Sequence, residues 1–199
     1  MNPNLALTHY HYSWALYLWG RMEEAITEHL LAKKYDPFNP LHSAWLGALY
    51  CYNGQYEEAI REAELAMELN PEYPVSYYVL GITYLEQGLE EEAIAAHKKV
   101  MEIVPYWTFP LVTTYARTGR MNEATRMAEE YEQTPVIPFT AINRAANYSQ
   151  VGKVDQAFTY LNFEPHHAWT AWAAVMPEYY NLRKDPRFNE FLDRLNLPD

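Results

Sequence analysis

The chain has 199 residues, of which 49% are hydrophobic and 21% are charged, and its formal net charge is −11 at pH 7. Nucleic-acid binding needs clustered Lys and Arg that contact phosphates, so we expect no binding to DNA or RNA. Charged residues or prolines interrupt every apolar stretch before the roughly 20 residues of a membrane-spanning helix, so we expect no membrane insertion. Cys51 is the only cysteine, which is compatible with the cytoplasmic location that we predict.

Five glycines recur along the chain at intervals of 34, 34, 31 and 33 residues, and an alanine follows each of them five positions later. The glycines are Gly20, Gly54, Gly88, Gly119 and Gly152. A unit of about 34 residues cannot bury its apolar face alone, so such units stack on their neighbours. The spacing therefore predicts a repeat array.

Apolar residues fall at helical spacing on both sides of each glycine, which predicts two helices in every unit. The first helices are predicted over 5–18, 41–53, 75–87, 107–118 and 139–151. The second helices are predicted over 22–35, 56–69, 90–103, 121–133 and 154–162. The corresponding repeats span about 6–39, 40–73, 74–104, 105–137 and 138–165.

Each glycine is expected to end the first helix in a left-handed conformation, which costs glycine little. Acidic residues such as Glu57 and Glu58 then open the second helix, where they complement the positive end of its dipole. The alanine after them, Ala59 in the second unit, should let the two helices approach closely.

The segment 166–199 lacks the repeat pattern, and we predict that it caps the last repeat. Asp185 is placed to cap a helix whose first position is Pro186. Apolar residues follow on one face of that helix, at Phe188, Phe191, Leu192 and Leu195. At the other end, Asn2 and Pro3 match the end of a repeat, so our hypothesis is that the chain is a piece of a longer protein or imitates a lost joint.

Further residues recur in register: Leu46, Gly47, Tyr50, Ala59, Ala66 and Pro71 in the second unit, and Tyr77, Leu80, Gly81, Tyr84, Ala93 and Pro105 in the third. This pattern resembles the tetratricopeptide repeat family. The resemblance implies a single all-α domain over 1–199, a right-handed α–α superhelix of about five helix pairs with C-terminal capping helices. The fourth and fifth units depart from the pattern, since Val112 and Ala145 replace the small glycine.

In this family one face of each first helix lines a concave groove that holds a partner. The resemblance places on that face Tyr10, Trp14, Tyr17, Tyr52, Tyr78, Tyr106, Phe109 and Arg117. Aromatic residues at this spacing equally suit the core between helices, and both interpretations stay open. Chaperone adaptors of the family hold a C-terminal carboxylate with Lys, Arg and Asn, which this face lacks, so that mode is not expected.

The resemblance implies a non-catalytic scaffold, with no cofactor, that binds a protein or peptide. Leu182–Pro198 also resembles the ending of bacterial tetratricopeptide regions that follow a cyclase, a serine/threonine kinase or a transcription regulator. It therefore implies a regulatory arm of a larger bacterial signalling protein. One alternative is the C-terminal domain of a nucleotide cyclase or kinase whose catalytic part is absent from this chain. Another is a self-assembly module, a homo-oligomer joined through the exposed repeat ends.

Two histidine pairs, His9 with His11 and His166 with His167, invite a metal site. Residues this close on a helix point to different faces, so neither pair chelates a metal without distant partners. Cys51 lies beside tyrosines on a predicted helix and is expected to be a small buried thiol. We therefore predict no catalytic, metal or cofactor-binding residue.

Overall fold

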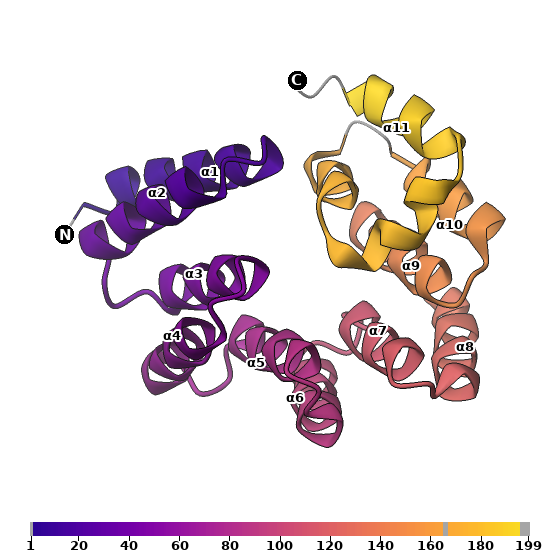
Figure 1. Ribbon diagram of the computed structural model, residues 1–199, viewed down its shortest axis with the longest axis horizontal. Coiled ribbons are helices and arrows are strands. Elements are labelled where there is room, and N and C mark those ends of the chain that lie inside the picture. Colours follow the sequence, from indigo (N-terminus) through magenta and orange to yellow (C-terminus); the bar gives the residue numbers. More distant parts are fainter. Residues whose placement is uncertain (1, 165–166, 196–199) are drawn as a thin grey trace. The chain divides into compact units, whose positions relative to one another are not determined.

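The computed structural model describes residues 2–164 and 167–195, and within these ranges all regular elements are helices (Figure 1). The all-helical prediction is confirmed. The chain divides into two compact units, Met1–Val104 and Pro105–Asp199, each of which is described by itself. None of the helices in the described part is both long enough and apolar enough to cross a membrane.

The first unit consists of three helix pairs. They are α1 (Pro3–Leu18) with α2 (Met22–Tyr35), α3 (Pro40–Tyr52) with α4 (Tyr56–Leu69), and α5 (Pro74–Glu86) with α6 (Glu90–Ile103). Successive pairs stack, because α3 packs against α2 and α5, and α4 packs against α5. These helices confirm the predicted ones to within two residues at either end.

The local signals act as expected. Pro40 begins α3, where its missing N–H is not needed, and the side chain of Asn39 accepts a hydrogen bond from the N–H of Leu41 at 3.1 Å. Gly54 ends the turn into α4 with a φ of 76°, a left-handed conformation. The first turn of α4 then holds Glu57 and Glu58.

The repeated alanines lie in the core, on the second helix of each pair. Ala25, Ala59, Ala93, Ala124 and Ala157 are all completely buried. A larger side chain at such a buried position overpacks the core, at a cost of roughly 1–3 kcal/mol.

The second unit contains α7 (Phe109–Arg117), α8 (Met121–Glu130), the short 3₁₀ helix η1 (Tyr131–Gln133), α9 (Pro138–Gln150) and α10 (Val154–Leu161). Two predicted bounds were wrong. The helix predicted from 107 begins at Phe109, because Pro110 is tolerated in the first turn but not deeper in a helix. The helix predicted to 133 leaves α-helical geometry after Glu130 and ends in η1.

Arg144 on α9 accounts for the way α8 ends. Its buried guanidinium donates hydrogen bonds to the backbone oxygens of Tyr131, Glu132 and Thr134, the Glu132 bond being 2.9 Å long. The guanidinium carbon also lies 5.0 Å from the centre of the Tyr160 ring. Arg144 thus supplies a side-chain donor to carbonyl groups that follow the end of α8.

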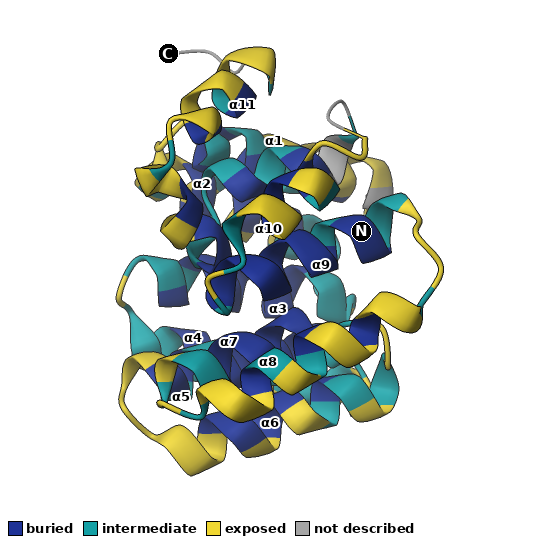
Figure 2. Ribbon diagram, turned by 90° about the vertical axis from the view of Figure 1, so that its right-hand side faces the viewer, coloured by how far each residue is buried: buried dark blue, intermediate teal, exposed yellow. Residues whose placement is uncertain are grey.

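The tail packs against the last helix pair, α9 and α10. It forms η2 (Ala168–Ala174), η3 (Pro177–Lys184) and α11 (Arg187–Leu195). Tyr179 of η3 donates from its hydroxyl to the carbonyl oxygen of Ile142 at 2.8 Å, and Gln150 donates to the carbonyl oxygen of Glu178 at 2.7 Å. As a result α9 is buried along most of its length (Figure 2).

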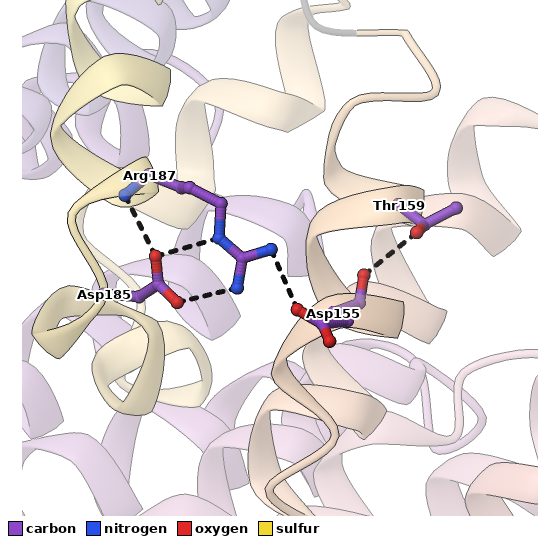
Figure 3. Close-up of polar contacts among 4 residues, drawn as sticks. All are labelled: Asp155, Thr159, Asp185 and Arg187. Atoms are coloured by element: carbon purple, nitrogen blue, oxygen red, sulfur yellow. Dashed lines mark hydrogen bonds and ion pairs between the residues drawn. The ribbon is translucent and has the colours of Figure 1, made fainter.

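An ion-pair cluster anchors α11 to α10 (Figure 3). Arg187 binds Asp185 at 2.7 Å and Asp155 of α10 at 2.9 Å, and its guanidinium carbon lies 4.6 Å from the centre of the Phe158 ring. Asp185 accepts the backbone N–H of Arg187, as expected of a cap, but the helix begins at Arg187, so the prediction of Pro186 as its first residue was wrong by one position. The predicted apolar face of this helix is confirmed at Phe188 and Phe191, which are buried.

Candidate partner-binding surface

The first helices of the pairs in the first unit carry almost no charge. Residues 5–18 and 41–53 contain no Asp, Glu, Lys or Arg, and residues 75–87 contain only Glu86. The second helices open with acidic residues and hold most of the charge of the unit. Charge is therefore concentrated on the second helices, and apart from Glu86 the face formed by α1, α3 and α5 offers only apolar, aromatic and uncharged polar groups.

Three tyrosines from three successive repeats connect these helices. The ring of Tyr17 on α1 stacks on that of Tyr52 on α3, with centroids 5.5 Å apart and planes 12° from parallel. The hydroxyls of Tyr52 and Tyr78 on α5 are 2.8 Å apart, within hydrogen-bond distance. We call Tyr17, Tyr52 and Tyr78 the tyrosine ladder. Its stacking and hydrogen bond hold the ring of Tyr52 in one orientation.

The tyrosine ladder continues into a wider aromatic cluster. Trp14 contacts Tyr10 and Tyr17 edge-on, with centroids 6.2 and 5.8 Å apart, and Trp45 of α3 at 5.2 Å. Trp45 in turn lies 6.3 Å from Tyr78. Offset and edge-on contacts of this kind stabilise by about 0.5–1.5 kcal/mol each beyond the buried area.

Burial divides the expected binding residues into two groups. Tyr78 has 0% of its side chain exposed, and Trp14 and Tyr17 are also buried, so these residues pack between helices. Tyr10 and Tyr52 are half-buried and keep part of their rings at the surface. The core interpretation is therefore confirmed for Tyr78, Trp14 and Tyr17, whereas a binding role for Tyr10 and Tyr52 stays a prediction.

Sequence reasoning missed Trp45 and Tyr73, which join this cluster. Trp45 contacts both Trp14 and Tyr78, and Tyr73 lies beside Trp45 and Tyr10 just before α5. Burial raises the pKa of Tyr73 to about 12. The signal that could have found Trp45 is the lack of charge around the whole of α3, because a helix without a polar face is packed on several sides.

The sequence analysis did not predict the two buried histidines His29 and His97. The Nδ1 atom of His29 lies 2.9 Å from the hydroxyl of Ser13, and Nε2 of His97 donates to the carbonyl oxygen of Tyr78 at 3.3 Å. Burial lowers the pKa of His29 to about 3 and that of His97 to about 4, because a charged imidazole loses its hydration in the core. Both side chains are therefore neutral at physiological pH.

The remaining expected residues, Tyr106, Phe109 and Arg117, belong to the second unit. Tyr106 precedes α7, as it precedes the helix predicted from 107, and its side chain is exposed. Its carbonyl oxygen accepts the hydroxyl of Tyr131 at 2.6 Å. Phe109 is buried in the first turn of α7, and Arg117 is exposed at its end. The tyrosine ladder is thus a feature of the first unit alone.

The other groups singled out in the sequence have local partners. His9 lies 2.6 Å from Glu28 and stacks on Tyr35, while His11 is exposed. Cys51 is buried, as expected. His166 falls outside the described residues. Among the residues that the structure does describe, no three His, Cys, Asp or Glu side chains are grouped so as to hold a metal ion.

Comparison with known proteins supports the repeat interpretation. Residues 40–105 match the model of the Tetratricopeptide repeat family, whereas comparison with curated sequences gave no match. The structure is similar to the tetratricopeptide protein TTC0263 of Thermus thermophilus, with a TM-score of 0.59 and 21% identity over 94% of this chain and 98% of that one.

Two further solved structures share the fold. Pseudomonas aeruginosa pilF has a TM-score of 0.54 and 14% identity over 98% of this chain and 94% of its own. The first tetratricopeptide domain of Spaghetti (RPAP3), solved with the HSP90 peptide SRMEEVD, has a TM-score of 0.51 and 21% identity over 67% of this chain and all of its own. At these identities the likeness establishes a helical solenoid fold.

Proposed function

We propose that the chain is a non-catalytic protein-interaction scaffold that binds a peptide segment across α1, α3 and α5 of the first unit. The main support for this proposal is the tyrosine ladder, in which the ring of Tyr52 is held by contacts with Tyr17 and Tyr78 of the two adjacent repeats. A preordered aromatic ring loses little conformational entropy when it binds, and tyrosine supplies both apolar area and a hydrogen-bonding hydroxyl. The tetratricopeptide match over 40–105 covers the helix that carries Tyr52.

The expected ligand is an extended peptide whose central residues are uncharged. The RPAP3 domain was solved with an acidic peptide, SRMEEVD. Residues 5–18, 41–53 and 75–87 of this chain contain no Lys or Arg to pair with carboxylates. Glu86, exposed at the end of α5, instead favours a basic residue at one end of the peptide. A segment with an aromatic or aliphatic side chain against Tyr52 and Tyr10 fits both features.

A test uses the full chain as bait for a phage-displayed library of random peptides, followed by titration of one selected peptide. Tyr52→Ala is expected to weaken its affinity at least about tenfold, the effect of a typical interface hot spot. Phe38→Ala is the matched control, because Phe38 is 69% exposed in the joint between α2 and α3, away from the tyrosine ladder. The proposal fails if both variants bind equally well, or if the peptide slows amide exchange in α2, α4 and α6 and leaves α1, α3 and α5 unchanged.

The wider role that we propose is the regulatory arm of a larger bacterial signalling protein located in the cytoplasm. The motivation is the resemblance of the segment that begins at Leu182, of which residues 196–198 lie outside the described part. The length of the native open reading frame tests this role. A reading frame that encodes a cyclase or kinase in the same chain favours the enzyme-domain alternative, in which this chain is the C-terminal domain.

A further inference from the structure

An apolar stripe runs along the side of α1 that no other helix of its unit covers. It consists of Leu5, Tyr12 and Trp19, which follows the last residue of the helix directly, and all three side chains are exposed. The residues are seven apart, two helical turns, so they lie on one side of the helix. Tyr10, Trp14 and Tyr17, which pack toward α2 and α3, lie on the other side.

The equivalent residues of the later repeats show whether this side of a first helix is buried or exposed there. Tyr12 corresponds to Leu46 on α3 and Leu80 on α5, each 34 residues further on. Tyr12 is 45% exposed, whereas Leu46 and Leu80 are 0% and 9% exposed. The difference arises because α3 packs against α2 and α5 against α4, while α1 is the first helix in the described chain. The α1 stripe thus corresponds to the side of a first helix that, in the later repeats, packs on its neighbour, the preceding pair.

Charge favours a second copy of the chain as that neighbour. The net charge of −11 makes two copies repel one another over most of their surface. Residues 3–18 carry no Asp, Glu, Lys or Arg, so this repulsion is weakest where two α1 helices meet. Arg21, close to the end of the stripe, is neutralised by Glu24 through two hydrogen bonds of 2.6 and 2.7 Å.

The spacing of the stripe is also self-complementary. Tyr12 lies midway between Leu5 and Trp19. A two-fold axis through Tyr12 pairs two antiparallel α1 helices so that Leu5 of one copy lies opposite Trp19 of the other, a smaller side chain against a larger one. Tyr12 then faces its own counterpart.

We propose that the α1 stripe is the contact surface of a symmetric homodimer. The tyrosine ladder lies on the other side of α1, so this contact leaves Tyr52 accessible and gives the dimer two equivalent peptide-binding surfaces. Such a scaffold binds a partner that carries two peptide segments more tightly than either segment alone. The dimer does not depend on the proposed peptide binding and is tested separately.

Sedimentation velocity of the full chain at concentrations from about 1 to 200 µM measures the dimer directly. The wild type is expected to shift from monomer to dimer across this range. Tyr12→Glu and Tyr12→Lys are each expected to remain monomeric, because like charges would meet at the two-fold axis. An equimolar mixture of the two variants is expected to dimerise again, since opposite charges then face each other.

Phe38→Glu is the control, because it places the same charge on a strongly exposed aromatic position outside the stripe, and it should dimerise like the wild type. Far-UV circular dichroism confirms that each variant is folded. The proposal is overturned if the wild type stays monomeric throughout, if Tyr12→Glu still dimerises, or if the mixture of folded Glu and Lys variants stays monomeric.

Discussion

The imidazole of His97 fills the space that a side chain at Gly81 would need, since a Cβ atom there would overlap the ring. The same two positions hold Ser13 and His29 in the first repeat, joined by a 2.9 Å contact between Oγ and Nδ1. In the second repeat they hold Gly47 and Ala63, and Ala63 is completely buried. The close fit between Gly81 and His97 is therefore particular to the third repeat, since a Cβ atom at Gly47 would instead meet Ala59, Glu62 and Val79.

We expect Gly81→Ala to lower the free energy of unfolding by about 1–2 kcal/mol, because overpacking by the added methyl outweighs the gain in helix propensity. In a His97→Ala background the same change should become neutral or stabilising, since the overlap disappears with the ring. Urea denaturation of the wild type, both single variants and the double variant measures the coupling. Equal effects of Gly81→Ala in the two backgrounds would show that the pair is not matched.

Much of this architecture could be read from residue spacing. The intervals between glycines, with the following alanines, place the helices of the first unit within two residues. The binding surface was harder to predict from the sequence, because α1 and α3 lack charged residues. Without a charged face, the spacing of apolar residues cannot distinguish the core side of a helix from its exposed side. Tyr78 was expected at the surface on register alone, and the structure buries it under contacts with Trp45 and His97.

In the second unit the repeat register fails for a different reason. Pro110 shifts the start of α7, and Arg144 binds the carbonyl groups where α8 gives way to η1. Arg144 stands 13 residues after Tyr131, whose carbonyl oxygen it contacts. A long-range contact of this kind leaves no periodic signal in the sequence.

The buried histidines predict a loss of stability in mild acid. The folded chain keeps His29 and His97 neutral down to pKa values of about 3 and 4, whereas the unfolded chain protonates histidine near pH 6.5. As the pH falls below 6.5 the unfolded state binds more protons, so stability falls until the pH reaches the folded pKa. Each histidine should contribute a loss of about 2 kcal/mol between pH 7 and pH 5.

Urea denaturation at pH 7 and pH 5 measures this loss, and His97→Leu isolates the share of one histidine. The difference in stability between the two pH values should shrink in this variant, whatever its stability at pH 7. His11→Gln is the control, because His11 is exposed on α1. If the wild type and His97→Leu lose equal stability on acidification, burial of His97 does not govern the response.

Arg144→Met should destabilise the second unit by about 1–3 kcal/mol, since it removes the donor that binds the carbonyl oxygens of Glu132 and Thr134 and one of the donors to that of Tyr131, which also accepts from Thr134. Amide exchange is expected to accelerate first around η1, which those contacts hold in place. Arg126→Met is the matched control, because Arg126 is exposed and lies 3.8 Å from Glu130 in its own helix. It should change stability by less than about 0.5 kcal/mol. Similar effects of the two substitutions would contradict a specific role for Arg144.

Arg187→Ala should detach α11 from α10 without unfolding the rest of the second unit. The change removes the contacts of the guanidinium with Asp185 and Asp155 and its packing over Phe158 (Figure 3). The ion pairs are exposed, so raising the NaCl concentration to about 1 M should mimic part of the effect in the wild type. Amide exchange in residues 187–195 is the measurement, with faster exchange expected there and little change expected in α9.

Arg61→Ala is the control, since Arg61 pairs with Glu58 in its own helix. If α11 exchanges at the wild-type rate in Arg187→Ala, the apolar contacts of Phe188 and Phe191 and the 2.6 Å hydrogen bond from Arg194 to Asn162 are enough to hold it in place.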